Sequence, residues 1–565
     1  MFLKIIHPKF YLQTSICLIL VVLGAFTEAI GLGLVMPLIS IVLQQSSDVG
    51  LASYISSYFQ ELGLVEISVI ILILFTCKFI LNIFRNYFVY GLEWYIRRYW
   101  MISIFNFNII QDFQEFESQK PGHITNTILN ETLKAASAFR QTIEFFAQIM
   151  QFLAFLIVLI LSEPKFSLVI LIFTILLFIC LKYGVVNRTT GFSRQRQEHE
   201  ENITHNVTEM INGMASIRSL KLENYLMSTF ERETLKLAKL MQITETTKRL
   251  PLLIVELTAV VVFTFLIFLA DLNKIELASK LPFLGMLFVM SVKLLNNTGS
   301  LATNYISIKV LWESVIKISN SLDLFLSSKP NRSKISSNLK NNFSVNEISC
   351  VDLEFSYKNG PVVIKKSNFN FKKGNITSIS GESGSGKSTI AKLLLNFYLP
   401  VSGTILIDSK PLENLDISKW RGIVGYVDQN PFFFFGTMFE NLTLGNSSFS
   451  NNQISQSIKS ANIEKFLSSL PNGLQTCLGD KGNSLSGGQK ARLALARTFL
   501  RNPKILVLDE ITGPLDNKNK KLVLETLSSL KNEMIIIIIT HDKEIIKNSD
   551  VAYEVKDHFV KANKK

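Results

Sequence analysis

The sequence predicts a protein of two parts, a helical membrane domain followed by an α/β domain. Three observations predict this division. Hydrophobic residues make up 48% of the 565 residues, and the apolar runs crowd into roughly the first 300 positions. A polar stretch then interrupts the chain near residue 330. Beyond it, strand-like and helix-like runs alternate, which is typical of an α/β sheet domain.

Six apolar segments predict six transmembrane helices, at 11–43, 65–91, 141–161, 166–186, 252–270 and 281–295. Most reach the roughly 20 residues that a helix needs to cross the hydrocarbon of a bilayer. Backbone polar groups cannot stay unpaired in lipid, so helix is the expected state of these runs. The first run is too long for a signal peptide, and we interpret it as a retained span.

The loops predict the orientation of the membrane domain. Those near 92–140 and 187–250 are long and rich in Lys and Arg, whereas the loop at 44–64 holds Asp48 and Glu61 without Lys or Arg. By the positive-inside rule, the long loops and both termini are expected in the cytoplasm, with the protein in the inner (plasma) membrane.

Composition also excludes some classes of function. A net charge of +13 suits a nucleic-acid binder or a membrane protein beside anionic lipid, and the apolar segments favour the second without a nucleic-acid partner. None of the five cysteines is paired at C-x-x-C spacing, so we expect neither a zinc site nor a disulfide framework.

The polar stretch "SSKPNRSKISSNLKNN" at 327–342 is expected to be a linker. We therefore predict a transmembrane domain at 1–325, a linker at 326–342 and a second domain at 343–565. In that domain "EMIIIIIT", which begins at Glu533, predicts a buried central strand.

The stretch "GESGSGKST" at 381–389 predicts a loop that binds nucleotide phosphates. It follows the strand-like "NITSIS" and precedes a helix-like run, the context that this motif requires. Glycines let backbone N–H groups close around phosphates, while Lys387 is expected to reach the β- and γ-phosphates and Ser388 to bind Mg²⁺. The expected binding residues are Gly381, Glu382, Ser383, Gly384, Ser385, Gly386, Lys387, Ser388 and Thr389.

The stretch "KILVLDE" predicts a second element of the same site. Its apolar residues form a buried strand, which places Asp509 at the strand end to bind Mg²⁺. The carboxylate of Glu510 follows directly and is expected to orient the attacking water, because phosphoryl transfer depends mainly on positioning.

The order of Tyr357, "GESGSGKST", Gln429, "LSGGQ", "VLDE" and His541 resembles the nucleotide-binding domain of ATP-binding cassette transporters. Six spans before that domain resemble the layout of an exporter half-transporter, and they exclude a soluble cassette ATPase. The resemblance implies a helical exporter domain joined to a P-loop ATPase domain, ATP hydrolysis coupled to transport, and ATP and Mg²⁺ as ligands.

The resemblance also implies roles for individual residues. Tyr357 is expected to stack on adenine, although an aromatic residue of a core strand is the alternative. Gln429 is expected to contact Mg²⁺ and the attacking water, and His541 the γ-phosphate. Asp516 fits the loop that communicates between two sites, although Gly513-Pro514 departs from the usual Ser-Ala there and leaves that signalling geometry open.

The signature "LSGGQ" implies a dimer, because in this family it contacts ATP that the partner subunit binds. Its residues are Leu485, Ser486, Gly487, Gly488 and Gln489. The helix that begins here presents N–H groups and a positive dipole end to an anion. Two half-sites per chain then make two complete sites in a homodimer.

The substrate is the least determined feature. The stretch "FTEAIGLGLVMPLI" resembles flippases for lipid-linked oligosaccharides, so a membrane lipid or lipid-linked substrate is favoured. Peptide or drug export is the alternative, and an ATP-gated channel is a rival of another class. Lys78 and Lys293 lie in apolar runs, where charges are costly. They are expected to attract a diphosphate, to extend toward the membrane interface, or to form ion pairs with residues such as Glu28 or Glu256.

Overall fold

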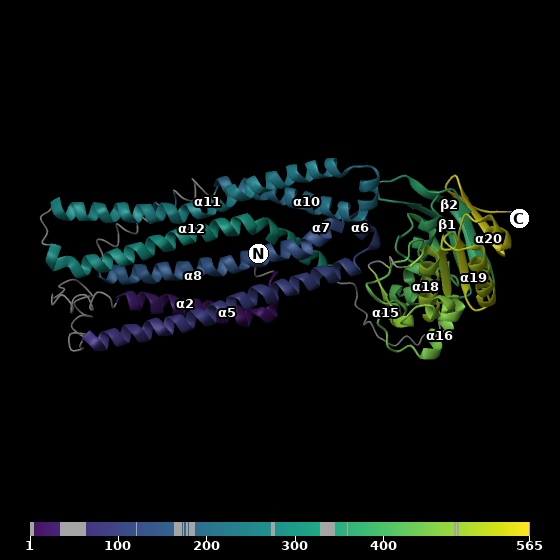
Figure 1. The fold of residues 1–565 in the computed structure, drawn as a ribbon, viewed down its shortest axis with the longest axis horizontal. Coiled ribbons are helices and arrows are strands. Elements are labelled where there is room, and N and C mark those ends of the chain that lie inside the picture. The colour runs from purple at the N-terminus through teal and green to yellow at the C-terminus, as the bar shows by residue number, and fades with distance from the viewer. Residues whose placement is uncertain are drawn as a thin grey trace. The chain divides into compact units, whose positions relative to one another are not determined.

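The computed structural model describes residues 5–33, 64–119, 121–162, 187–272, 277–327, 345–358, 360–479, 482 and 485–563, with four isolated positions between 163 and 186. Contacts divide the chain into two units, residues 1–111 with 115–332 and residues 112–114 with 333–565. The first unit is helical, and the second combines helices with sheets (Figure 1).

The first unit consists of long helices joined by short elements. They are η1 (Pro8–Phe10), α2 (Tyr11–Gly33), α5 (Leu64–Ile110), α6 (Phe113–Ser118), α7 (Pro121–Asn126), the π-helical η2 (Thr127–Glu131), α8 (Thr132–Ser162), α10 (Asn187–Ser219), α11 (Glu223–Leu272) and α12 (Leu277–Ser327). The first two residues of α6 are grouped with the second unit.

Five of the six predicted spans lie wholly or partly in these helices. They are the segments in α2, α5, α8, α11 and α12, whereas 166–186, 34–43 and the loop at 44–64 lie almost entirely outside the described residues. Within the described part of the chain, three helices are long and apolar enough to cross a bilayer, at Pro8–Gly31, Ser68–Ile110 and Gly122–Val158.

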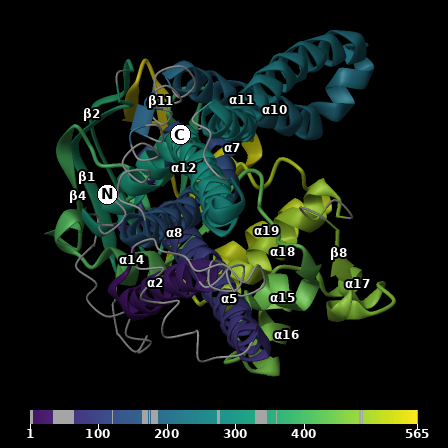
Figure 2. The same cartoon turned by 90° about the vertical axis from the view of Figure 1, so that its left-hand side faces the viewer.

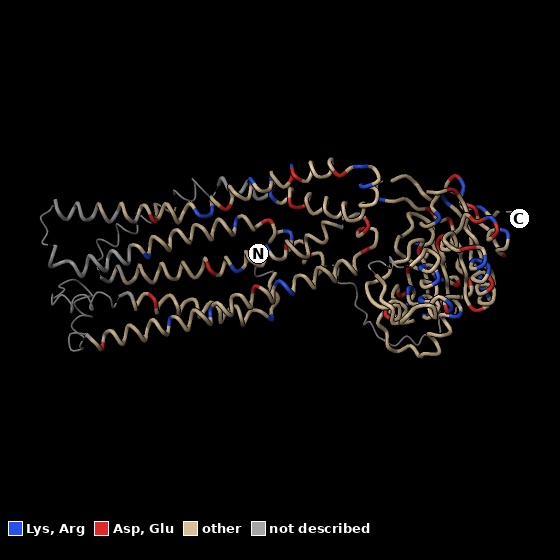
Figure 3. The backbone as a smooth tube through the Cα atoms, in the orientation of Figure 1, with Lys and Arg blue, Asp and Glu red and all other residues tan. Residues whose placement is uncertain are grey.

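The long helices pack side by side. Helix α8 lies along α12 and α2, α5 lies along α2, and α10 lies along α11, as both views show (Figure 2). Trp100 on α5 is fully buried, and its indole N–H donates to the carbonyl oxygen of Ile5 at 3.2 Å. Figure 3 shows that charged residues are sparse along the left-hand stretch of the described helices and denser toward their right-hand ends.

The second unit contains a six-stranded sheet in the order β12-β11-β3-β10-β9-β6 and a four-stranded sheet in the order β2-β1-β4-β5, beside the two-stranded β7-β8. The strands are β1 (Glu347–Ser356), β2 (Val362–Lys372), β3 (Ile376–Gly381), β4 (Ser402–Ile407), β5 (Lys410–Pro411), β6 (Val424–Val427), β7 (Gly436–Thr437), β8 (Cys477–Leu478), β9 (Ile505–Asp509), β10 (Ile535–Ile539), β11 (Val551–Lys556) and β12 (Phe559–Ala562).

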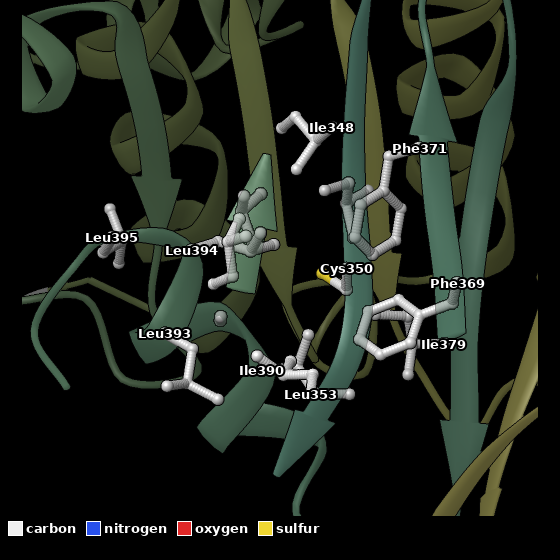
Figure 4. Packing of buried hydrophobic residues seen from close by; sticks show 14 of the residues in the cluster. Ile348, Cys350, Leu353, Phe369, Phe371, Ile379, Ile390, Leu393, Leu394 and Leu395 are labelled. Atoms are coloured by element: carbon white, nitrogen blue, oxygen red, sulfur yellow. The ribbon is translucent and has the colours of Figure 1, made fainter. Parts of the chain in front are cut away.

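Helices of the second unit connect these strands. They are α13 (Lys387–Leu394), η4 (Leu412–Asn414), α14 (Ile417–Ile423), α15 (Met438–Thr443), α16 (Asn451–Ser460), α17 (Glu464–Ser468), η5 (Gly473–Gln475), α18 (Gly487–Leu500), α19 (Asn517–Leu530) and α20 (Lys543–Asn548). Figure 4 shows one core of this unit, where β1, β2 and β3 direct Leu353, Phe369 and Ile379 toward Ile390 of α13.

The large sheet determines where the functional residues meet. Strand β10 is buried throughout and pairs in parallel with β3 on one side and β9 on the other, which confirms the predicted central strand. Strand β6 pairs in parallel with β9. Since parallel strands end at the same edge, the segments that follow β3, β10, β9 and β6 come together there, where ligands bind in such sheets.

Candidate functional site

The phosphate loop joins β3 to α13, as the sequence predicts. Gly381 has φ +149°, and a Cβ atom there would lie 2.5 Å from the Val555 carbonyl oxygen. Gly386 has φ +105°, and its Cβ would lie 2.8 Å from Val363 Cγ1. Both backbone conformations favour glycine, so the turn depends on these two positions.

Lys387 closes over its own loop. The residue is buried, and its ammonium group donates to the carbonyl oxygens of Gly381 at 3.0 Å and Glu382 at 2.7 Å. Helix α13 begins at Lys387, so its first N–H groups face the loop. Ser388 is exposed, Thr389 is buried, and Ser383 and Gly384 lie exposed on the loop. This arrangement suits an anion with several oxygen atoms.

Asp509 ends β9 in an environment that compensates its charge only in part. Its side chain is buried, and Oδ2 accepts one hydrogen bond from the Tyr426 hydroxyl at 3.4 Å. In the described part of the chain, Asp509 Oδ1 has no hydrogen-bond partner. Burial raises the pKa of Asp509, and Asp428 and Glu510 raise it further, while Ser388 lowers it. A carboxylate oxygen in this state fits a hard divalent cation such as Mg²⁺.

Glu510 lies between two other residues of the predicted site. Gln429 Nε2 donates to Glu510 Oε2 at 2.7 Å, and His541 Nδ1 lies 3.7 Å from Glu510 Oε1. The backbone of Glu510 has φ +49°, and its N–H donates to the Ile539 carbonyl oxygen at 2.9 Å. A non-glycine residue in this conformation stores strain of the kind found at functional sites. The sheet thus brings together three residues that are distant in sequence.

Tyr357 connects the end of β1 to the phosphate loop. Its hydroxyl lies 3.0 Å from Thr389 Oγ1, within hydrogen-bond distance. Its ring meets Phe355 and Tyr398 edge to face, with centroids 5.2 and 5.5 Å away. The side chain is 37% exposed, so the ring remains accessible for stacking.

The signature residues begin α18 at Gly487, as predicted. Ser486 is the N-cap: its hydroxyl accepts from the Gln489 N–H at 3.3 Å, and the Gln489 side-chain oxygen accepts from the Ser486 N–H at 2.8 Å. This capping box defines the helix start. Leu485 is buried, whereas Ser486 and Gly487 are exposed. No hydrogen bond or ion pair among the described residues joins the signature to the phosphate loop of the same chain.

The loop after Glu510 reaches the signature. A Cβ on Gly487 would lie 3.1 Å from Pro514 Cβ, and one on Gly488 would lie 3.2 Å from the Pro514 carbonyl oxygen. Asp516 caps α19 by accepting from the Asn519 N–H at 2.7 Å. The unusual proline therefore packs directly against both signature glycines.

In the helical unit, Lys78 and Lys293 meet at one carboxylate. Glu28 Oε1 lies 2.9 Å from the Lys78 ammonium and 3.2 Å from that of Lys293. Glu28 is buried, and its Oε2 accepts from the Gln151 amide at 3.0 Å. The alternative of ion pairing with Glu28 is the one observed in the described residues, while Glu256 is exposed. The cluster still carries one excess positive charge.

Sequence reasoning missed several contacts at these sites. Tyr426 beside Asp509 and Gln151 beside Glu28 carry no motif of their own. Arg492 and Lys520, whose contacts are described below, also lie in ordinary helix. Only the sheet order or helix packing brings such residues to their partners, and the one local signal was the position of Tyr426 near the end of a strand.

Comparison with known proteins agrees with both units. A family model described as ABC transporter matches residues 364–513, and one described as ABC transporter transmembrane region matches residues 16–273. ABC transporter B family member 1 of Dictyostelium discoideum is 40% identical over 206 residues, which are 36% of this chain and 23% of that protein. A multidrug resistance ABC transporter ATP-binding and permease protein of Lactococcus lactis is 36% identical over 210 residues, 37% of this chain and 36% of that protein.

The chain thus spans less than two thirds of the length of these curated relatives. The chain is also similar to a solved structure of a bacterial Atm1-family ABC exporter with ATP bound, with a TM-score of 0.79 and 18% identity. The similarity covers 98% of this chain and 94% of the solved chain. At this identity the likeness concerns the fold alone. It confirms the predicted fold class, a helical exporter domain together with a P-loop ATPase domain.

Proposed function

We propose that this chain, which two ABC transporter family models match over residues 16–273 and 364–513, hydrolyses ATP to drive export or flipping of a substrate. It does so as a homodimer in the inner (plasma) membrane, with both termini in the cytoplasm. The observation that carries the hydrolytic part is Glu510, placed between Gln429 and His541 and directly after Asp509.

The chain's own residues divide the work of hydrolysis. Lys387 and the N–H groups of the phosphate loop bind the phosphates, and Tyr357 stacks on the base. Glu510 orients the attacking water and polarises it, while Gln429 orients the Glu510 carboxylate by donating to it. His541 lies on the other side of that carboxylate and faces the γ-phosphate.

The metal site is formed by Ser388, Gln429 and Asp509. A Mg²⁺ ion held by these residues would neutralise charge on the nucleotide phosphates. Asp509 fits this role because its Oδ1 is buried and lacks a hydrogen-bond partner among the described residues. A cation bound here would offset the cost of burying that oxygen.

The homodimer follows from the signature. Ser486, Gly487 and Gly488 contact the γ-phosphate of the ATP bound by the partner subunit, and Asp516 lies in the loop between the two sites. ATP then stabilises only the closed pair of cassettes, and hydrolysis releases them. Nucleotide shifts the equilibrium by its difference in affinity for the two states.

We favour a lipid-linked oligosaccharide or related lipid as the substrate, whose anionic group contacts Lys78 and Lys293. The excess positive charge around Glu28 supports an anionic substrate. A drug or peptide exporter fits the cassette equally well, and one relative carries the name of a multidrug resistance transporter. ATPase stimulation in liposomes by lipid-linked sugar, peptide or drug discriminates between these substrates. An ATP-gated channel would instead pass current while its gate is held open.

The decisive experiment replaces the carboxylate of Glu510. In purified protein in liposomes, Glu510→Gln is expected to abolish phosphate release and to trap ATP-bound dimers. Glu525→Gln, an exposed glutamate on α19, is the matched control and is expected to turn over normally. Turnover retained by Glu510→Gln would refute the assignment.

A second experiment tests the crossed arrangement. Ser486→Arg blocks the site on the partner chain, and Lys387→Ala removes the site on its own chain. Mixed dimers of the two single variants keep one intact site, so activity is expected to return when they are combined. Absence of any rescue would argue against a dimer with shared sites.

A further inference from the structure

The first turn of α19 contacts two functional segments at once. Asp516 caps this turn, and Asn519 donates to it twice, through its N–H to Oδ1 at 2.7 Å and through its side-chain Nδ2 to Oδ2 at 2.9 Å. The two bonds fix the orientation of the Asn519 amide. They leave its side-chain oxygen directed away from the cap and available as an acceptor.

The Asn519 side-chain oxygen accepts from the signature helix. Arg492 Nη1 on α18 donates to Asn519 Oδ1 at 3.2 Å and to the Asn462 carbonyl oxygen at 2.8 Å. Arg492 Nε also donates to the carbonyl oxygen of Gly488, a signature residue, at 3.4 Å. A planar guanidinium that donates to three acceptors has little freedom to rotate. The start of α18 is therefore linked to the start of α19.

The loop before α19 supports the same helix start from another direction. Pro514 packs against the backbone of Gly487 and Gly488, where added Cβ atoms would lie only 3.1 and 3.2 Å away. Proline restricts its own φ, which stiffens the loop at this contact. The signature is thus held by Pro514 on one side and by Asn519 through Arg492 on the other.

Lys520, the residue after Asn519, contacts the segment that carries His541 in the same chain. Lys520 forms an ion pair with Asp542, which directly follows His541, and both side chains are largely shielded from solvent. This ion pair lowers the pKa of Asp542, whose Oδ1 also accepts from the Glu544 N–H at 2.9 Å and caps α20. The segment that carries His541 is therefore tied to α19, and His541 in turn lies beside Glu510.

We propose that the first turn of α19 is a positioning element that aligns the two half-sites of one chain. Asn519 holds the signature for the ATP of the partner subunit, and Lys520 holds His541 for the ATP of its own chain. Neither residue touches nucleotide. The two residues are adjacent in one turn, so both half-sites of the chain are held against the same element. This inference rests on the proposed function.

Because each proposed ATP site uses residues of both chains, mixed dimers can separate a positioning role of Asn519 and Lys520 from a general role in folding. In mixed dimers, one chain carries Lys387→Ala and cannot load ATP, so the single working site combines the phosphate loop of the intact chain with the signature of the disabled chain. A second change is then placed on either chain. Asn517→Ala and Lys518→Ala, exposed neighbours on the same turn, are the matched controls.

Asn519→Ala on the disabled chain is expected to raise the KM for ATP about tenfold, the effect of losing a hydrogen bond to a charged group. When Asn519→Ala is placed on the intact chain, the affected signature faces the site that cannot load ATP. The KM for ATP is then expected to stay within about twofold of that of the parent dimer. Lys520→Ala is expected to lower kcat only when it is placed on the intact chain, because that chain supplies His541 to the working site. Lys520→Arg on the same chain is expected to keep kcat near that of the parent dimer.

Equal effects on both chains would overturn the proposal, because misfolding of either cassette would destroy the single site. Absence of any effect on either chain would overturn it as well. The parent dimer with Lys387→Ala alone tests the proposed function separately. If that dimer has no activity, or if Ser486→Arg on its disabled chain has no effect, the crossed-site function fails rather than the role of α19.

Discussion

The substitution Asp509→Asn is expected to stabilise the protein while it removes a proposed ligand of Mg²⁺. Asp509 is 3% exposed, Oδ1 has no hydrogen-bond partner in the described chain, and Oδ2 accepts a 3.4 Å hydrogen bond from Tyr426, while Ser388 favours the ionised carboxyl. A buried polar group without a partner costs about 1–3 kcal/mol, and more when charged. Since the new amide also has an unmatched donor, we expect a net gain of about 1 kcal/mol, or about 2–4 °C in Tm for a domain of this size.

The pH dependence follows from the direction of the pKa shift. Burial raises the pKa of Asp509 in the folded state, so the folded state binds this proton more tightly than the unfolded state. Below the pKa of the unfolded state, the carboxyl is protonated in both states and costs no stability. As pH rises toward the higher pKa of the folded state, ionisation lowers the free energy of unfolding, and this loss reaches its full value above that pKa. The gain in stability from Asp509→Asn is therefore expected at neutral pH, and it is expected to decrease as the pH is lowered.

The assay is thermal unfolding of the full chain in lipid nanodiscs with a chelator and without nucleotide. Asp428→Asn, an exposed carboxylate that also raises the Asp509 pKa, is the matched control and is expected to have a smaller effect of the same sign. Added Mg²⁺ and ATP are expected to stabilise the native protein and much less the Asp509 variant. A lower melting temperature for Asp509→Asn without Mg²⁺ would refute the reasoning.

Three further substitutions test other parts of the structure. Gly381→Ala is expected to destabilise the cassette by several kcal/mol in chemical denaturation, because its Cβ meets a backbone oxygen at 2.5 Å, whereas Gly384→Ala, with φ +80° and open space, is expected to cost only about 1–2 kcal/mol. Glu28→Gln leaves two lysines uncompensated in the helical unit, so its thermal stability in nanodiscs is expected to fall more than that of Lys293→Gln. Trp420→Phe removes a 2.7 Å hydrogen bond from a buried indole, and a loss of about 1–3 kcal/mol is expected in the same denaturation; an unchanged midpoint for any of the three would contradict its argument.

The sequence predicts the local elements of the site well, because each is specified by adjacent residues. The phosphate loop lies between β3 and α13, β10 is the buried central strand, and the signature begins α18. Glycines at positions of positive φ, an unbroken run of isoleucine and a serine followed three residues later by glutamine are all short-range signals.

The charged cluster of the helical unit shows where such reasoning ends. Lys78 and Lys293 are recognisable as charges in apolar runs, but the sequence leaves two acidic partners open. Packing of α2, α5, α8 and α12 places both lysines on Glu28 and adds Gln151. Nothing in the spacing of these residues encodes that choice.

What the sequence by itself determined is the set of groups and their local conformations: a glycine-rich loop between a strand and a helix, a carboxylate after a buried strand, and a capped helix start. Only the tertiary structure decided which of these groups meet. The parallel order of β3, β10, β9 and β6 brings Gln429, Glu510 and His541 to one edge, and the first turn of α19 joins the signature to that edge. The physical reason is that helix caps and turns depend on neighbours within a few residues, whereas strand order and helix contacts depend on burying the whole core at once.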